Sequence, residues 1–117
     1  MARLPVAGQN LAIAAVVVPG TTYYMSLHSA DPGTTGASEL SGGTYARQAY
    51  VATAASAGSE GNTAVITVPN AGSVAATHIG IWSAVTVGTY IIGAPLSAPV
   101  TATSIQFAIG VATFSAS

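Results

Sequence analysis

Four of the five histidine, aspartate and glutamate side chains in this sequence could together form a metal site or act as acid–base groups. They are the imidazoles of His28 and His78 and the carboxylates of Asp31 and Glu39. Two imidazoles and two carboxylates could coordinate Zn²⁺ or Mn²⁺. Their spacing matches no recognised ligand pattern, and His28 and Asp31 lie on either side of an expected strand end. We therefore interpret each histidine as a strand residue that hydrogen-bonds a nearby backbone or hydroxyl group, and we expect no metal and no other cofactor.

Arg47 is the positively charged residue nearest to Asp31 and Glu39 along the sequence. It is the only arginine beyond Arg3, the chain has no lysine, and it follows a loop that contains Asp31 and Glu39. A half-buried guanidinium needs a carboxylate partner, preferably a bidentate one. We expect Asp31, Glu39 and Arg47 to form a structural clamp that ties the loop to the next strand. A contact between Arg47 and a glycan or a neighbouring subunit is the alternative.

No catalytic arrangement can be assembled from the remaining polar residues. Ser26 and Ser29 flank His28, but no G-x-S-x-G motif presents a nucleophile. The Gly42-Gly43 pair lacks the lysine of a phosphate-binding loop. The run from Asp31 to Gly33 predicts a turn, and the residues after it offer no carboxylates for Ca²⁺. We predict that the protein is not an enzyme and has no catalytic residues.

Aromatic side chains are the candidates for contacts with other molecules. Alternation along a strand would place about half of the tyrosines in the core or at a subunit interface. Exposed tyrosines could instead stack on a sugar. The sole tryptophan would anchor a core or an interface. The interface candidates are Tyr23, Tyr24, Tyr45, Tyr50 and Trp82.

One short helix and a series of strands must position these residues. Apolar residues at helical spacing predict a helix over 6–17, which Pro19-Gly20 ends. Alternating polar and apolar residues between Gly and Pro turns then predict strands, with a hairpin turn at Val87-Gly88 and a loop between Pro95 and Pro99. The expected strands are 23–28, 45–53, 63–68, 78–83, 90–94, 104–109 and 111–114.

Seven short strands favour a mainly β fold. We expect an antiparallel β-sandwich or small barrel with a short N-terminal helix. We expect an N-terminal arm and helix over 1–18 and a single β-sandwich domain over 19–117. The sequence shows neither the fixed-period repeat nor the heptads with which a fibre shaft gains length. The expected inner layer is Leu27, Ile66, Ile79, Ile81, Ile91, Ile105, Phe107 and Ile109.

The composition points to an assembly component. Charged residues make up 4% of the 117 residues, whereas an ordinary soluble domain has about 25%. A monomer with so few charged residues is poorly protected against association. We therefore expect much of the surface to lie against other copies or a larger assembly. With a net charge of -1, binding to nucleic acid is not expected. The apolar run 11–18 is far shorter than the ~20 residues of a membrane span, and we expect synthesis in the cytoplasm without export.

Three stretches resemble a family of small virion proteins of tailed bacteriophages, the tail fibre or minor tail proteins. The most specific is 26–49, which reads SLHSADPGTTGASELSGGTYARQA. The run THIGIW at 77–82 and the opening GQNL at 8–11 are weaker matches. The resemblance implies a structural role in the virion.

Together these observations predict a non-enzymatic virion structural protein of a tailed phage. We expect a self-associating β module, most simply a homotrimer, that contacts other virion proteins in the tail or decorates the exterior of the capsid. The alternative is a receptor- or glycan-binding module displayed on the virion, with exposed tyrosines and Asp31 on a host surface glycan. Head or tail location, stoichiometry and host receptor stay open at this point.

Overall fold

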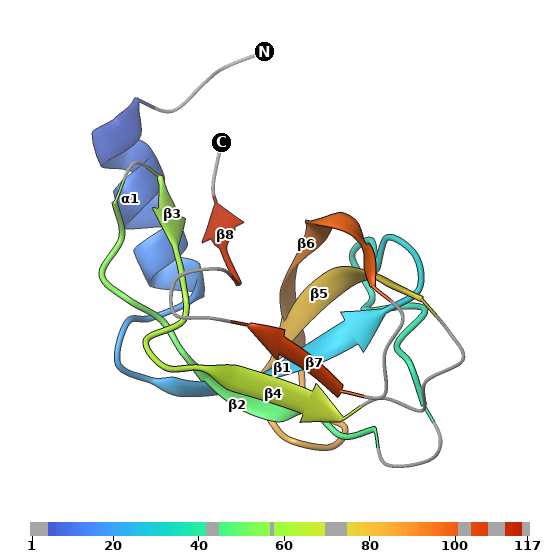
Figure 1. The fold of residues 1–117 in the computed structure, drawn as a ribbon. Helices are drawn as coiled ribbons and strands as arrows, with labels where there is room; N and C mark the ends of the chain where they lie inside the picture. The colour runs from blue at the N-terminus through green and yellow to red at the C-terminus, as the bar shows by residue number, and fades with distance from the viewer. Residues whose placement is uncertain are drawn as a thin grey trace.

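The computed structural model describes residues 5–41, 45–56, 58–69, 75–100, 104–107 and 112–115. In this part of the chain, one helix precedes eight strands (Figure 1). No helix within it is long and apolar enough to cross a bilayer. The elements are α1 (Val6–Val16), β1 (Thr22–His28), β2 (Gln48–Val51), β3 (Ser59–Glu60), β4 (Ile66–Pro69), β5 (Ala76–Trp82), β6 (Tyr90–Val100), β7 (Ser104–Phe107) and β8 (Phe114–Ser115).

The described strands pair antiparallel in three sheets. The largest has the order β2-β1-β5-β6, whereas β4 pairs with β7 and β3 pairs with β8. The β4–β7 pair lies over one face of the large sheet, and the two share one apolar core (Figure 1). This confirms the predicted mainly β, antiparallel fold with a short N-terminal helix. The sheets are compatible with a sandwich and are not closed into a barrel.

The expected inner layer is largely present in this core. Six of its eight residues are buried, and Ile91 is half-buried against them, while Ile109 lies outside the described residues. The six are Leu27, Ile66, Ile79, Ile81, Ile105 and Phe107.

The large sheet is covered on both faces. Along β1 the burial does not alternate, because Met25 and Leu27 face the core while Ser26 and His28 are equally buried on the opposite face. In β5, Gly80 is the partner of Ser26 in the strand register and lies on that same outer face. The loop between β1 and β2 covers this face, and it is the loop that carries the family-like motif.

α1 is an apolar helix that turns little of its surface to the core. It starts after Pro5 and ends at Val16, one residue before the predicted end. Within the helix Ile13 is the buried residue, whereas the side chain of Leu11 is 76% exposed. The helix packs beside β3 and β8 (Figure 1). The amide of Gly58, just before β3, donates a hydrogen bond to Asn10 Oδ1 (2.8 Å).

Two segments differ from the sequence prediction. The expected loop between Pro95 and Pro99 is wrong, because β6 runs through both prolines. β6 is the last strand in its sheet, and an edge strand tolerates residues that lack an N–H. The Gly and Ser residues of 56–62 also predict a turn cluster, but this stretch contains the two-residue strand β3, whose partner β8 lies more than fifty residues away.

Candidate functional site

The loop after β1 folds back onto the strand that it leaves. Asp31 Oδ1 accepts a hydrogen bond from the Gly33 amide (2.8 Å), so the Asp-Pro-Gly run forms a turn of the predicted kind. The Leu40 amide donates to the carbonyl of Leu27 (2.9 Å), which closes the loop alongside β1. These bonds place residues 29–39 over the outer face of the large sheet.

Gly36 lets this loop lie directly on an aromatic pair. Trp82 and Tyr90 meet edge to face, with ring centroids 5.3 Å apart. Gly36 has a φ of +74°, and a Cβ added to it would lie 2.5 Å from Trp82 Cζ2. Below the pair, a Cβ on Gly80 would lie 2.8 Å from His28 Nε2. Gly36 and Gly80, one from each of these two family-like motifs, therefore stand where a side chain would not fit.

A directional chain of hydrogen bonds joins the buried polar groups on this face. Trp82 Nε1 donates to Ser26 Oγ (2.9 Å), and Ser26 Oγ is 2.6 Å from His28 Nε2. His28 Nδ1 is 2.7 Å from the carbonyl oxygen of Ala37. Because a carbonyl can only accept, Nδ1 carries the proton, and Nε2 accepts from the serine hydroxyl. Burial lowers the pKa of His28, in keeping with this neutral form.

Arg47 connects three separate segments. Its Nη2 and Nε donate to the two carboxylate oxygens of Glu39 (2.8 and 2.9 Å), which is a bidentate ion pair. Its Nη1 donates to the carbonyls of Ala84 (3.1 Å) and Val87 (2.7 Å) in the β5–β6 turn. The guanidinium carbon also lies 3.8 Å from the centroid of the Trp82 ring. The loop, the approach to β2 and the hairpin turn therefore meet at this side chain.

Glu39 is held from a second side by Tyr45. The tyrosine hydroxyl donates to Glu39 Oε2 (2.7 Å) and accepts from the Leu27 amide (3.1 Å). Burial would raise the pKa of Glu39, but the hydrogen bonds from Arg47 and Tyr45 outweigh it and lower that pKa. Asp31, grouped with this pair from the sequence, makes its described hydrogen bond within its own turn instead.

The other aromatic candidates have different surroundings. Tyr50 is completely buried, and its hydroxyl donates to the carbonyl of Ala112 (2.9 Å), so it belongs to the core of the single chain. Tyr23 and Tyr24 are half-buried on β1. The Tyr23 hydroxyl accepts from the Val18 amide (3.0 Å), next to the end of α1.

The two histidines do not come together with carboxylates to hold a metal. His78 Nδ1 lies 2.9 Å from Thr77 Oγ1, whereas the ring of His28 is bonded as described above. Among the described residues, no group of three or more His, Cys, Asp or Glu side chains is placed to bind a metal ion.

A pocket of about 330 Å³ opens beside the Arg47–Glu39 pair. It lies between residues 39–41 and 45–47 on one side and the hairpin turn 85–87 on the other. Val85 and Val87 on its rim are 48% and 84% exposed. Val87 also has a φ of +57°, which is rare for a β-branched residue. The sequence placed a turn here correctly, but it gave no sign that an exposed valine would adopt this conformation.

A family model described as Podophage GP4 fiber I protein gp80 matches residues 9–114. The chain belongs to this phage fibre family. The predicted resemblance to tailed-phage tail fibre proteins is thereby confirmed, and the protein is a structural component of a phage virion. No curated protein matches the chain.

The contacts described above show what the family-like motif does in this fibre protein. Ser26, His28 and Gly36 support and cover the outer face of the sheet, and Glu39 with Arg47 joins the loop to the hairpin turn. Each contact is internal to the chain. The motif therefore shapes the surface of this fibre protein and leaves the turn 85–87 and the pocket beside it exposed.

Proposed function

We propose that the chain is a non-enzymatic, self-associating module of the phage tail, of the fibre or minor tail type. The matched fibre family supports a tail position over a decoration of the capsid exterior. In this proposal residues 1–18 are an attachment segment and 19–117 are the β domain. The protein is made in the host cytoplasm and joins other virion proteins as a homo-oligomer, with a trimer as the expected form.

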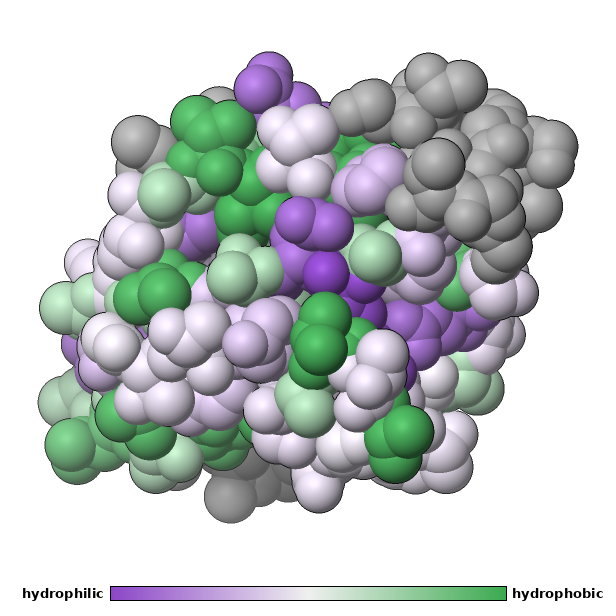
Figure 2. Space-filling model, turned by 90° about the horizontal axis from the view of Figure 1, so that it is seen from below, coloured by the Kyte–Doolittle hydropathy of each residue, from purple (hydrophilic) through white to green (hydrophobic). Residues whose placement is uncertain are grey.

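The uncharged surface of α1, which exposes apolar side chains on several sides of the helix, is the observation that carries self-association. The helix has no charged residue, and the exposed fractions are 55% for Val6, 76% for Leu11 and 43% for Val16. A helix that is apolar on its outer side normally packs against another surface. On the face shown in Figure 2, hydrophobic and neutral residues likewise cover most of the described surface. Contact with other copies would remove this apolar surface from water.

Light scattering over a dilution series tests the proposal. We expect an oligomer for the wild type and a shift toward monomer for Leu11→Glu, because a carboxylate on the outer face of α1 would be desolvated in the interface. Val65→Glu is the matched control, since Val65 is also an exposed apolar residue (52%) but lies before β4. A monomer at every wild-type concentration would refute self-association. An unchanged mass for Leu11→Glu would exclude α1 as the interface.

A second candidate function is binding of a host surface glycan at the pocket beside Arg47. Its lining combines the Tyr45 ring and the hydroxyl-bearing Ser41 and Thr86 with the paired Glu39 and Arg47, and its volume of about 330 Å³ suits a small ligand. Ala46 also lines it and is exposed, so Ala46→Trp would fill the pocket without removing a contact of the core.

A glycan array and a host-cell binding assay test this second function. We expect the wild type to be retained and Ala46→Trp to lose binding. Ala54→Trp is the matched control, because Ala54 is exposed and lies outside the pocket lining. Absence of retention by the wild type, or equal retention by both variants, would exclude the pocket as a receptor site.

A further inference from the structure

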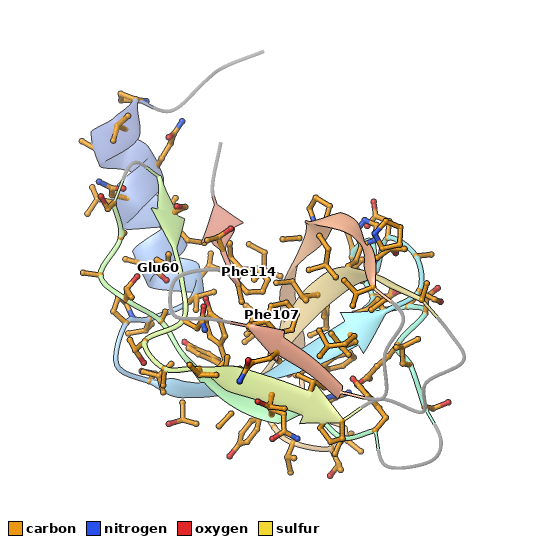
Figure 3. All side chains as sticks on the ribbon, viewed as in Figure 1. Glu60, Phe107 and Phe114 are labelled. Atoms are coloured by element: carbon orange, nitrogen blue, oxygen red, sulfur yellow. The ribbon has the colours of Figure 1, made fainter. Side chains whose placement is uncertain are left out.

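A carboxyl group is buried beneath α1 without a hydrogen-bond partner in the described part of the chain. Glu60, in β3, is 1% exposed, and neither of its carboxyl oxygens has a partner among the described residues. Figure 3 shows it beside the end of α1 that leads into β1, with Phe114 of β8 nearby. Burial of an ionised carboxylate without hydrogen bonds is strongly unfavourable, and burial accordingly raises the pKa of Glu60.

The neighbouring elements offer no compensating charge. α1 and β8 contain no titratable side chain. β2 contributes Tyr50, which also contacts Phe114 edge to face. Burial, followed by the nearby Glu60, raises the pKa of Tyr50, so the phenol stays neutral. Arg47, the one arginine or lysine among the described residues, is paired with Glu39.

The helix that covers Glu60 is attached to the rest of the fold by few of the described contacts. β3 and β8 are two residues long each, and α1 is followed by Pro19 and by Gly20 with a φ of +81°. The helix is anchored mainly by the buried side chains of Ile13 and Val17. Short strands and a peripheral helix belong to the parts of a protein that open at low cost. Lifting α1 would therefore hydrate Glu60 while the large sheet stays intact.

We propose that Glu60 is a proton-controlled latch for α1. The protonated carboxyl allows the helix to stay packed on β3 and β8. When the carboxyl loses its proton to water, the charged form favours an open state in which α1 separates from the strands and exposes Ile13 and Val17. This proposal concerns the attachment of the helix within one chain and holds whether or not copies associate.

Two measurements on the full chain test the latch. The first is a titration by carbon NMR of protein labelled at the glutamate carboxyl carbon. The chain has only two glutamates, Glu39 and Glu60, so two signals are expected. We expect one signal to titrate below the ordinary value of 4.5 and the other above it. A Glu60 signal that titrates at or below 4.5 would overturn the proposal, since the carboxylate would then be hydrated or paired.

The second measurement is amide hydrogen exchange in α1 as a function of pH, compared with Glu60→Gln at each pH. The glutamine cannot ionise, so we expect equal protection of the two proteins at acid pH and weaker protection of the wild type above the Glu60 pKa. Above the Glu60 pKa, exchange in the wild type should be faster than in Glu60→Gln by about tenfold for each unit by which the pKa of Glu60 in the closed state exceeds its pKa in the open state. Asp31→Asn, which removes an exposed carboxylate, should exchange like the wild type. Parallel pH profiles of amide exchange for wild type and Glu60→Gln would overturn the latch. If Glu60→Gln fails to fold, the wild-type titration and the pH profile of wild-type exchange test the latch on their own.

Discussion

Replacing Gly36 by alanine measures how closely the loop packs on Trp82. The new methyl group would lie 2.5 Å from Trp82 Cζ2 and 2.7 Å from Cη2, so the ring or the loop must move. Overpacking of this kind costs about 1–3 kcal/mol. The φ of +74° adds about 1–2 kcal/mol for a residue with a Cβ. We therefore expect Gly36→Ala to lower the free energy of unfolding by roughly 2–5 kcal/mol.

Gly33→Ala in the same loop separates the two contributions. Gly33 has a φ of +59°, but a Cβ there would meet nothing within 4 Å, so only the backbone cost of about 1–2 kcal/mol applies. Any effect of alanine on the unfolded chain is shared by both variants and cancels in their difference. Urea unfolding followed by circular dichroism and by the fluorescence of the sole tryptophan gives both values. Equal destabilisation by the two substitutions would refute the close packing of loop and ring.

Three further predictions concern the same face of the sheet. Arg47→Lys should lower the free energy of unfolding by about 2 kcal/mol, because lysine cannot keep the bidentate pair and the carbonyl bonds together, and a double-mutant cycle with Glu39→Gln should show coupling in urea unfolding. The wild type should lose free energy of unfolding as the pH falls below 6.5, because His28 takes up a proton more readily in the unfolded chain than in the folded chain, where its pKa is lowered. His28→Gln should abolish this loss. Both proteins are compared in the Glu60→Gln background, because the raised pKa of Glu60 makes the free energy of unfolding change with pH in the opposite direction. Val87→Gly should raise the melting temperature, because it relieves about 1–2 kcal/mol of backbone strain at a φ of +57°. An unchanged or lower melting temperature would contradict this, since contacts of the valine side chain would then offset the strain.

The strands of the core could be predicted because their residues alternate. Leu27, Ile79 and Ile81 mark the inner faces of β1 and β5, and all three are buried. The burial of Ser26 and His28 on the other face could not be predicted from alternation, since it depends on a loop that folds over the sheet. The pairing of β3 with β8 was equally hidden, because two residues give no periodic signal.

The candidate site was predictable only where charge limits the choices. With a single arginine near two carboxylates, a clamp of Arg47 with both Asp31 and Glu39 was expected, and the structure places Glu39 at Arg47 while Asp31 closes its own turn. The latch carboxyl of Glu60 gave no such sign, because it lies in a Gly- and Ser-rich stretch that is typical of an exposed turn. Its burial follows from the packing of α1 and β8, which are distant in the sequence.

The pairing of early with late strands has a consequence during synthesis. β3 and β4 find their partners in β8 and β7, so neither small sheet can form until residues 104–115 have left the ribosome. Until then Ile66 and Val68 stay without their cover on a nascent chain with little charge to keep it apart from its neighbours. Long-range pairings of this kind fold slowly and leave apolar segments open to aggregation. The soluble yield of this fibre protein therefore depends on how fast residues 104–115 are translated, and slow translation of these residues should lower it.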